Sequence, residues 1–337
     1  MSPSEPIADS LLAWLLEPSD AAVRHLALRQ LLGRSSADPE VAQARAAAMV
    51  SAPIAPILAA RNPEGWWVKP GGGYSPKYTA TVWNLIFLDQ MGADGDDDRI
   101  RAGCEYVLNH AQASNGGFGA SGAIGQTPPS RAIHCLNGNL LRALIGFGRL
   151  DDDRVQRSLA WQAAAITGEG MDRWYGFTSG PGFRCGANSG RPCAWGATKA
   201  VLALARVPVE RRSAAVAGAL SAGVDFLLSR DPAVADYPMP PDNTRPSSSW
   251  FKLGFPSGYV ADVLQVLEAL CETGAAGDAR LGSAFNWLLT QRDAEGRWAN
   301  RYTYESKMVR NIDRAGRPSK WVTLRALGVL RARAETA

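Results

Sequence analysis

The sequence of 337 residues lacks any apolar run near the length of about 20 residues that a membrane-spanning helix requires. Residues 1–6 also lack the basic stretch followed by an apolar stretch that is typical of a secretory signal. We therefore expect a cytoplasmic protein without a membrane span. The content of 46% hydrophobic and 20% charged residues is that of a folded globular chain.

Charge of one sign and cysteine are also scarce. The formal net charge is +4, and the arginines are scattered along the chain, which argues against a nucleic-acid partner. The five cysteines of a cytoplasmic protein are expected to stay reduced, so disulfides are not expected. Strand-like segments are nearly absent, which favours a helical fold.

Helix-periodic apolar segments recur along the chain at near-regular intervals, and a proline opens each of five of them. Because proline suits the first position of a helix, these prolines predict five helix starts. Several segments end in a glycine turn followed by an aspartate that can cap a second helix. The five prolines are Pro76, Pro129, Pro192, Pro256 and Pro318.

A loop that contains glycine and an aromatic residue follows most of the second helices, as at Gly117-Phe118 and Gly296-Arg297-Trp298. The repeating unit is therefore helix, turn, helix and loop. Such a hairpin cannot bury its apolar face alone and must stack on its neighbours. The sequence predicts one all-α domain of helical hairpins.

The predicted domain spans residues 1–337. Residues 62–333 carry the repeats, and residues 1–60 form extra N-terminal helices that pack on them. Residues 231–249 contain five prolines and a run of three serines, and interrupt the repeat as an insertion loop. A long insertion of this kind is either a functional lid or a tolerated surface loop.

Helical hairpins separated by glycine-aromatic loops resemble the α/α-toroid superfamily of squalene and hopene cyclases and protein prenyltransferase β subunits. The resemblance implies an (α/α)5-6 toroid whose five proline-started helices ring an apolar cavity. The first turns of these helices would then face the mouth of a common pocket. It also implies a small-molecule enzyme, a lyase, hydrolase or isomerase, that acts on an apolar or aromatic, isoprenoid-like substrate.

The predicted first turns are rich in aromatic and polar residues. An aromatic residue lies three positions after the proline in three of the five helices, and this recurrence at one level of a ring favours a cavity lining. Aromatic residues at helical spacing also pack in cores. The predicted substrate contacts are Tyr78, Trp83, Asn139, Trp195, Trp250 and Trp321.

Cysteine and histidine form the most specific pattern. Cys185 and Cys193 flank a Gly/Asn/Ser turn at a predicted helix start, where the helix dipole favours the thiolate. The segment 190–193 resembles the cysteine element of prenyltransferase zinc sites, and the segment 133–136 resembles their histidine element, in reversed order and without the aspartate two residues before the cysteine. This resemblance implies Zn²⁺ held by Cys185, Cys193 and either His134 or Cys135, with one open position for catalysis.

Two alternatives use the same residues. In a metal-free dehydratase or isomerase, Cys185 and Cys193 would exchange protons with the substrate beside His134 and a carboxylate, as in linalool dehydratase, another α/α-barrel enzyme. In a non-catalytic binding protein, the toroid is a scaffold and the cysteines only pack. A closed zinc site with four protein ligands is a third, structural alternative.

Acidic residues provide further candidates. Asp262 follows Tyr259 by three residues, on the same predicted helix face, and it either caps a neighbour or lines the pocket. We include both residues as catalytic candidates. Residues 94–97 (Asp-Gly-Asp-Asp) match the acid motif of squalene-type cyclases, but Asp152 and Asp278 occupy equivalent turns, so we interpret the match as helix capping.

Overall fold

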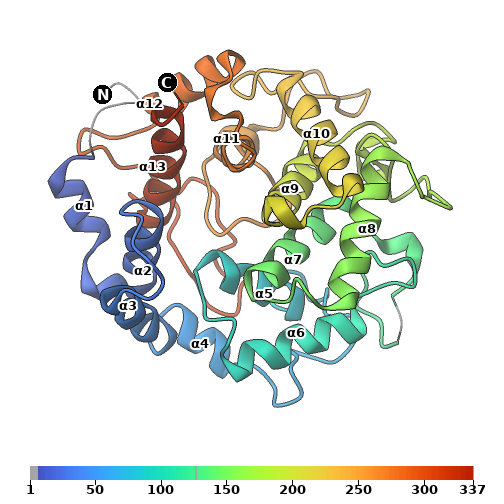
Figure 1. Ribbon diagram of the computed structural model, residues 1–337, viewed down its shortest axis with the longest axis horizontal. Helices are drawn as coiled ribbons and strands as arrows, with labels where there is room; N and C mark the ends of the chain where they lie inside the picture. Colours follow the sequence, from blue (N-terminus) through green and yellow to red (C-terminus); the bar gives the residue numbers. More distant parts are fainter. Residues whose placement is uncertain (1–6, 126, 337) are drawn as a thin grey trace.

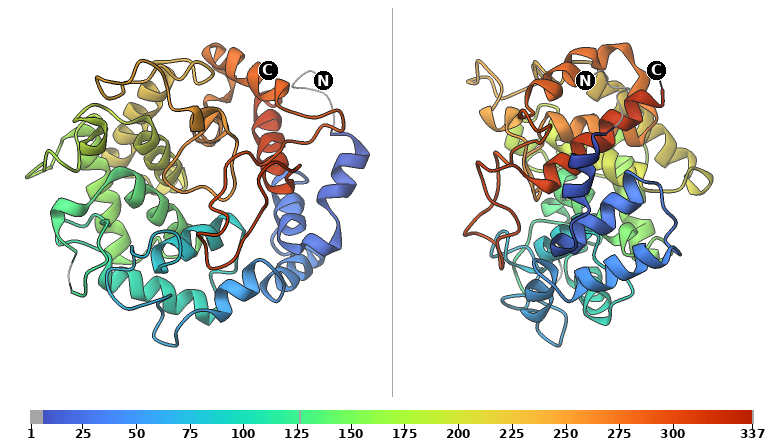
Figure 2. Two further views of the ribbon diagram at one scale, coloured as in Figure 1. Left: turned by 180° about the vertical axis from the view of Figure 1, so that it is seen from behind. Right: turned by 90° about the vertical axis from the view of Figure 1, so that its left-hand side faces the viewer.

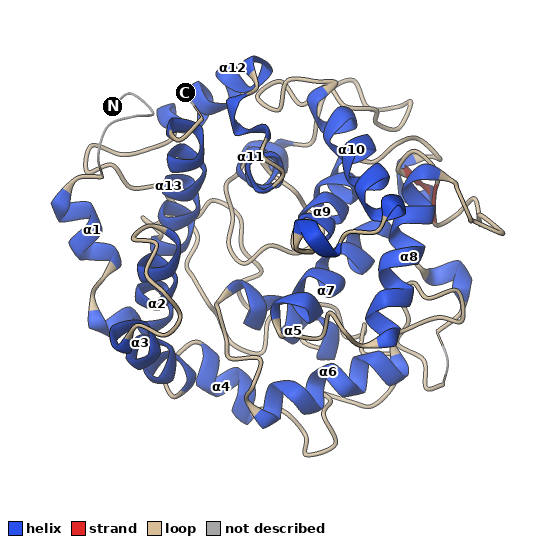
Figure 3. Cartoon of the chain, in the orientation of Figure 1, coloured by secondary structure: helices blue, strands red, loops and turns tan. Residues whose placement is uncertain are grey.

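A computed structural model of the chain describes residues 7–125 and 127–336. Within this part the chain has thirteen α-helices and a single pair of two-residue antiparallel strands, β1 (Ser179–Gly180) and β2 (Arg184–Cys185). Figure 3 shows that helices and their connecting loops make up nearly the whole molecule. The prediction of an all-α fold is confirmed.

The helices form two concentric rings, as Figure 1 shows. In the inner ring, each helix contacts the next from α5 to α13, and α13 contacts α2. Gly92, just after α5, completes the circle, because a Cβ atom there would clash with Leu26 of α2. The inner helices are α2 (Ala21–Gln30), α5 (Thr81–Gln90), α7 (His134–Gly146), α9 (Ala194–Ala205), α11 (Val263–Glu272) and α13 (Lys320–Ala334).

The outer ring surrounds these six helices. Helices α6, α8, α10 and α12 each pack on the inner helix that precedes them, and α3 packs on α2. The N-terminal helices thus do more than pack on a toroid, since α2 takes the sixth place in the inner ring. The outer helices are α1 (Asp9–Leu15), α3 (Pro39–Met49), α4 (Ile54–Ala59), α6 (Asp98–His110), α8 (Asp153–Thr167), α10 (Ala214–Leu228) and α12 (Gly282–Thr290).

Aspartate caps start several outer elements, as the sequence predicts. Asp97, Asp152 and Asp278 each accept a hydrogen bond from the backbone N–H two residues later. The residue at that position is always arginine, and its guanidinium also binds the aspartate carboxylate. Asp97 of the acidic segment 94–97 therefore caps α6, as the helix-capping interpretation predicts.

Two of the glycine-aromatic loops tie an outer helix to the next inner helix through the same contacts. The backbone N–H of Trp67 donates to the hydroxyl of Thr81 in α5, and that of Trp298 donates to the hydroxyl of Thr323 in α13. Both indole N–H groups donate to a carbonyl of the preceding outer helix, at 2.8 Å. Because both rings are fully buried, the same residue pattern fixes the same corner in two distant repeats.

The prolines lie outside the helices that they were expected to open. The N-cap residues of the five inner helices are Ala80, Ile133, Cys193, Asp262 and Ser319, so each proline precedes its helix by at least two residues. Asp262 and Ser319 cap their helices through side-chain oxygens. Pro192 and Pro318 lie just before the N-cap residues of their helices, whereas Pro76, Pro129 and Pro256 lie within the preceding loops.

The two ends of the toroid differ in the length of their connections. At the C-terminal ends of the inner helices, short turns such as residues 91–97 and 147–152 lead to the outer helices. At the N-terminal ends, longer segments such as residues 229–262 and 291–319 return to the inner ring, and Figure 2 shows these loops projecting from one side. The apolar core is continuous from Leu11 in α1 to Leu330 in α13.

None of the described helices is long and apolar enough to cross a membrane.

Candidate functional site

A cavity of about 760 Å³ lies inside the inner ring, and all six inner helices contribute to its lining. Its mouth is formed by residues at the C-terminal ends of these helices, among them Gln30, Arg206 and Glu272, and by Gly95 in a short turn. The prediction that the first turns of the inner helices face the mouth is wrong. Long loops cover that end of the ring, so the open end is the one with short connections.

Residues 254–258 form the floor of the cavity, and we call this segment the central plug. Gln90 of α5 exchanges two hydrogen bonds with the backbone of Ser257, at 2.7 and 2.9 Å. Asn139 of α7 donates to the Gly258 carbonyl at 3.0 Å. On the opposite side, the ring of Phe255 stacks on Trp321 of α13, with centroids 4.5 Å apart and planes within 5°. Three inner helices therefore hold the plug.

The walls of the cavity combine apolar and ionic side chains. The apolar contributors come from four of the six inner helices and from the plug. They are Leu26, Ile86, Leu202, Phe255, Trp321, Leu324 and Val329. This lining can accept the apolar body of a ligand, whereas the other half of the lining is strongly polar.

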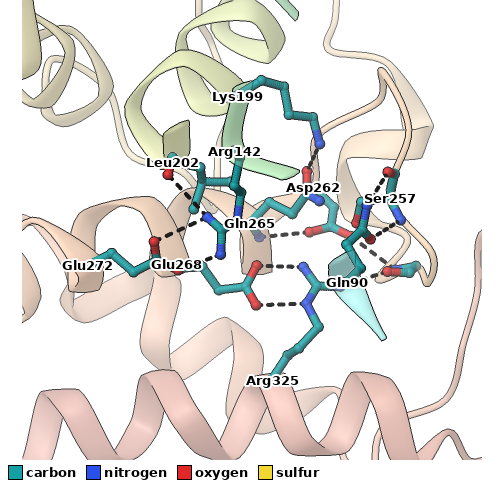
Figure 4. Close-up of polar contacts among 11 residues, drawn as sticks. Gln90, Arg142, Lys199, Leu202, Ser257, Asp262, Gln265, Glu268, Glu272 and Arg325 are labelled. Carbon is teal, nitrogen blue, oxygen red and sulfur yellow. Dashed lines mark hydrogen bonds and ion pairs between the residues drawn. The ribbon is translucent and has the colours of Figure 1, made fainter. Parts of the chain in front are cut away.

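Three arginine–carboxylate pairs line the cavity, and each pair joins two inner helices. Arg325 of α13 binds Glu268 of α11 with two hydrogen bonds, at 2.6 and 2.7 Å. Arg142 of α7 binds Glu272 of α11 in the same manner, at 2.7 and 3.1 Å. Figure 4 shows these two pairs converging from three helices. They cross-link the ring while placing charge beside the cavity.

The third pair joins Asp89 of α5 to Arg206, which follows α9, at 3.1 Å. The Asp89 side chain is only 6% exposed, and burial raises the pKa of its carboxyl above the ordinary value, against the opposing charge of Arg206. A carboxyl in this environment keeps its proton to higher pH than an exposed aspartate, which suits a general acid.

Asp89 was not among the residues predicted from the sequence, although its position near a helix C-terminus is a recognisable signal. It is the penultimate residue of α5, and an acidic side chain near a helix C-terminus is disfavoured by the helix dipole. An aspartate in that position, after the apolar run from Leu85 to Leu88, requires a partner or a function. Such a residue should be taken as a site candidate.

Lys199 of α9 is a second ionisable group that was not among the predicted site residues. It is 1% exposed, and its ammonium group donates to the side chain of Gln265, which lines the cavity (Figure 4). Burial lowers the pKa of Lys199 to about 7, although the negative charge of Asp262 opposes the shift. The lysine is thus partly neutral at neutral pH, which reduces the cost of burying it.

Of the predicted substrate contacts, Asn139 and Trp321 line the cavity. Tyr78 and Trp83 lie below the central plug in an aromatic cluster at the closed end, with ring centroids 4.9 Å apart. Tyr259, a predicted catalytic residue, packs against Trp83 at 5.0 Å, and the Lys77 ammonium lies 4.8 Å from its ring. Burial raises the pKa of Tyr78 to about 12.

The two remaining predicted substrate contacts, Trp195 and Trp250, are not among the residues that line the cavity. Trp195 is partly buried against the main core. Trp250 is 4% exposed, and its indole N–H donates to the Pro232 carbonyl at 2.9 Å. This hydrogen bond joins the two ends of the predicted insertion loop. Tyr237 anchors the same loop to α10 through a 2.6 Å hydrogen bond to the Leu227 carbonyl. The insertion does not line the central cavity.

His134, one of the two alternatives for the residue that completes the cysteine site, has other partners. Its Nε2–H donates to the Gly180 carbonyl at 3.1 Å, and its Nδ1 accepts from the Gln162 side chain at 2.9 Å. Burial lowers the pKa of His134 to about 4, so the imidazole is neutral. Both ring nitrogens are engaged, and the histidine links α7 to α8 and to β1.

Asp262 also has structural contacts. Its Oδ1 accepts from the Gln265 N–H at 2.9 Å, and its Oδ2 accepts from the Gly254 N–H at 3.0 Å. The carboxylate therefore caps α11 and fixes the start of the central plug. Of the two alternatives drawn from the sequence, the capping role is the one observed.

Cys185 and Cys193 are brought together by the structure, as predicted. The interaction between the two thiols lowers the pKa of Cys185 to about 6 and raises that of Cys193, which burial raises further. Cys135 lies near enough to both for their charges to interact, and burial raises its pKa to about 12. None of these three thiols is among the residues that line the central cavity.

The donor set does not fit the predicted zinc site. Across residues 7–125 and 127–336, no three cysteine, histidine or acidic side chains are placed to hold one metal ion. His134 has both nitrogens occupied, and Cys185 instead contacts a thiol and backbone N–H groups. We therefore derive no step through a metal. Zinc stays a prediction, for which metal content of the wild-type chain beside Cys193→Ala is the direct test.

No protein-family model matches the chain, and no curated protein matches its sequence. Among solved structures, the chain is similar to a variant of the type II terpene cyclase MstE from Scytonema in complex with its substrate, geranylgeranyl dihydroxybenzoate. The two are 13% identical over 98% of this chain and 100% of that one, with a TM-score of 0.35. Another MstE variant, in complex with the product merosterolic acid A, matches over the same shares at 13% identity and a TM-score of 0.34.

Proposed function

We propose that the chain is an enzyme that binds one small organic molecule in the central cavity and transfers a proton to it from Asp89. The substrate would have an apolar or aromatic, isoprenoid-like body and a polar end. The reaction class would be that of a lyase or isomerase. The observation that carries this proposal is the cavity of about 760 Å³ with a nearly buried carboxyl in its wall.

The lining supports this substrate class by its division into two kinds of surface. Ile86, Leu202 and Leu324 offer contact to an apolar body, and Trp321 and Phe255 present a stacked aromatic pair. Burying such a body removes its apolar surface from water, at about 25 cal/mol per Å². Five arginines against three carboxylates leave the ionic part of the lining with an excess of positive charge, which favours a polar or anionic end.

Asp89 supports the chemistry by its environment. Its raised pKa favours the protonated form at a higher pH than usual, and Arg206 would stabilise the carboxylate left after proton transfer. The ion pairs of Arg142 and Arg325 hold the neighbouring helices in place, so the acid is presented from a rigid wall.

The first experiment measures binding of farnesol and of a prenylated hydroxybenzoate by calorimetry, in the wild-type chain and in Leu202→Trp. The bulkier indole should project into the cavity and strongly weaken binding, because Leu202 is buried in its wall. Val209→Trp, at a site that is 73% exposed, is the matched control and should bind like the wild type. Equal binding by Leu202→Trp would overturn the cavity as the site.

The second experiment follows product formation by mass spectrometry with any ligand that binds. Asp89→Asn should keep the affinity within a few-fold and lose about a hundredfold or more in turnover, the usual contribution of a general acid. Asp96→Asn removes an exposed turn carboxylate, 83% exposed, and should leave turnover unchanged. Turnover by Asp89→Asn at the wild-type rate would contradict the assigned acid. Binding without turnover in the wild type supports the non-catalytic alternative.

A further inference from the structure

Three of the five cysteines gather at the closed end of the toroid, where the function proposed for the cavity does not use them. Cys185 lies in β2, Cys193 is the N-cap residue of α9, and Cys135 is in the first turn of α7. All three are partly exposed. Cys104 and Cys271 lie elsewhere, in α6 and α11, and provide internal references.

The hairpin of residues 183–193 fixes the relative positions of two of these thiols. The Cys185 N–H donates to the Arg191 carbonyl at 3.1 Å, and the Cys193 N–H donates to the Phe183 carbonyl at 2.8 Å. Between them, Arg184 and Pro192 form an antiparallel bridge. Because successive side chains on a strand alternate between faces, Cys185 and Cys193 lie on the same face of the hairpin, on opposite strands.

The hairpin therefore places the two thiols next to each other on one face, beside the tight turn Gly186–Asn188. The Cys193 thiol and the backbone N–H groups of Ala187 and Asn188 lower the pKa of Cys185, against the effect of burial. A lowered pKa favours the thiolate, the form of a thiol that attacks a disulfide.

We propose that Cys185 and Cys193 form a thiol–disulfide exchange site that reacts with a small disulfide such as oxidised glutathione. Cys185 is the attacking thiol, because it lies partly exposed in the hairpin strand and its pKa is lowered beside Cys193. Cys193 is the resolving thiol. This inference concerns the closed end of the toroid and does not depend on the function proposed for the cavity.

The reaction balances in two exchange steps. The Cys185 thiolate attacks one sulfur of oxidised glutathione, the S–S bond of that reagent breaks, and one glutathione thiolate leaves. Cys193 then loses its proton to solvent and attacks the Cys185 sulfur of the mixed disulfide, which releases the second glutathione. Two protein thiols are oxidised to one disulfide, and one oxidised glutathione is reduced to two thiols.

The chain offers a convenient readout. Trypsin cleaves after Arg184 and Lys199 but not between Arg191 and Pro192, so both cysteines stay in one peptide of residues 185–199. The full-length protein is equilibrated with graded ratios of oxidised to reduced glutathione, its free thiols are alkylated, and the digest is analysed by mass spectrometry. We expect this peptide to lose two hydrogens and to escape alkylation at ratios where Cys271 is still fully alkylated.

Single variants separate the two roles. Cys193→Ser should accumulate glutathione on Cys185, because no second thiol resolves the mixed disulfide. Cys185→Ser should leave Cys193 free of glutathione at the same ratios. Cys271→Ser is the matched control, also a partly exposed cysteine, and should form the 185–199 disulfide like the wild type. Circular dichroism establishes that each variant is folded before it is scored.

Two results would overturn the proposal. One is a 185–199 peptide that remains fully alkylated in the wild type at ratios that already oxidise Cys271. The other is a wild-type chain that retains glutathione on Cys185 to the same extent as Cys193→Ser, because Cys193 would then not be the resolving thiol. Either outcome leaves the function proposed for the cavity untouched.

Discussion

The two ends of the toroid are built from the same six inner helices, yet they differ in chemistry. At the open end, short turns leave the cavity accessible, and Arg142, Arg206 and Arg325 pair with carboxylates in its wall. At the closed end, long loops cover aromatic rings, a neutral histidine and three thiols. The central plug separates the two. The length of the connections thus determines whether the helix ends border the opening of the cavity or are covered by loops.

The comparison also shows two ways to bury polar groups. The open end buries charge and compensates it with bidentate ion pairs between helices, which is costly unless both partners are present. The closed end keeps its ionisable groups neutral, as for His134, or satisfies them with backbone donors and acceptors. Removing one partner should therefore be more harmful at the open end than removing an exposed ion pair from the surface.

The largest loss of stability is expected for a substitution in the central plug. Phe255→Ala deletes a fully buried ring that stacks on Trp321, and the cost should be about 4 kcal/mol in the free energy of unfolding. Urea unfolding followed by circular dichroism measures it. Phe177→Ala, at a residue 67% exposed, is the control and should change stability by less than about 0.5 kcal/mol. Equal stability of the two variants would show that the plug does not hold the two ends apart.

The next effect tests the charged end. Arg325→Met leaves Glu268 without its bidentate partner in a site where the two side chains are 13% and 18% exposed, and should cost about 3 kcal/mol in the free energy of unfolding. The double variant Arg325→Met, Glu268→Gln removes the orphaned charge and should recover a large part of that loss. If the double variant is less stable than Arg325→Met alone, charge burial does not govern this end.

The closed end should respond to pH. The pKa of His134 is lowered from 6.5 to about 4 in the folded chain, so between these values the unfolded chain binds a proton that the folded chain excludes. Stability contributed by the neutral ring is present above pH 6.5 and is lost as pH falls, by about 2 kcal/mol between pH 7 and pH 5. Urea unfolding of wild type and His134→Asn at both pH values measures this. A difference between the two pH values that is the same in both chains would contradict the assignment.

The smallest effect is expected outside both ends. Arg101 pairs with Asp96 at 3.2 Å, with side chains 49% and 83% exposed. Arg101→Gln should change the free energy of unfolding by no more than about 0.5 kcal/mol, because water and salt screen an exposed pair. The same urea titration provides the reference against which Arg325→Met is judged. A loss near that of Arg325→Met would remove the contrast between buried and exposed pairs.

The helical repeat was predictable because its signals are local. Aspartate caps and glycine-aromatic loops act over a few residues, so Asp97 and Trp298 could be assigned from their neighbours alone. The cavity was not predictable in the same way. Arg142 and Glu272 are 130 residues apart, and Arg325 and Glu268 are 57 apart, and nothing in either local sequence identifies the partner.

The thiol pair and the histidine show where local reasoning succeeds and fails at the site. Cys185 and Cys193 flank one short turn, and their meeting follows from the hairpin between them. His134 and Cys135 are adjacent, but neighbouring side chains on a helix diverge by about 100°. Which of the two faces the thiols depends on Gln162 and Gly180, which belong to other elements.

The contact between the first and last inner helices has a consequence for the order in which the molecule can be completed. Lys320 at the start of α13 pairs with Glu17 at 2.6 Å, and Arg331 donates to the Leu31 carbonyl at 2.6 Å, across about three hundred residues of chain. The cavity has no complete wall until α13 is in place. During synthesis, hairpins from α5 onward can stack as they emerge, but the wall of the cavity is complete only when α13 packs against α2.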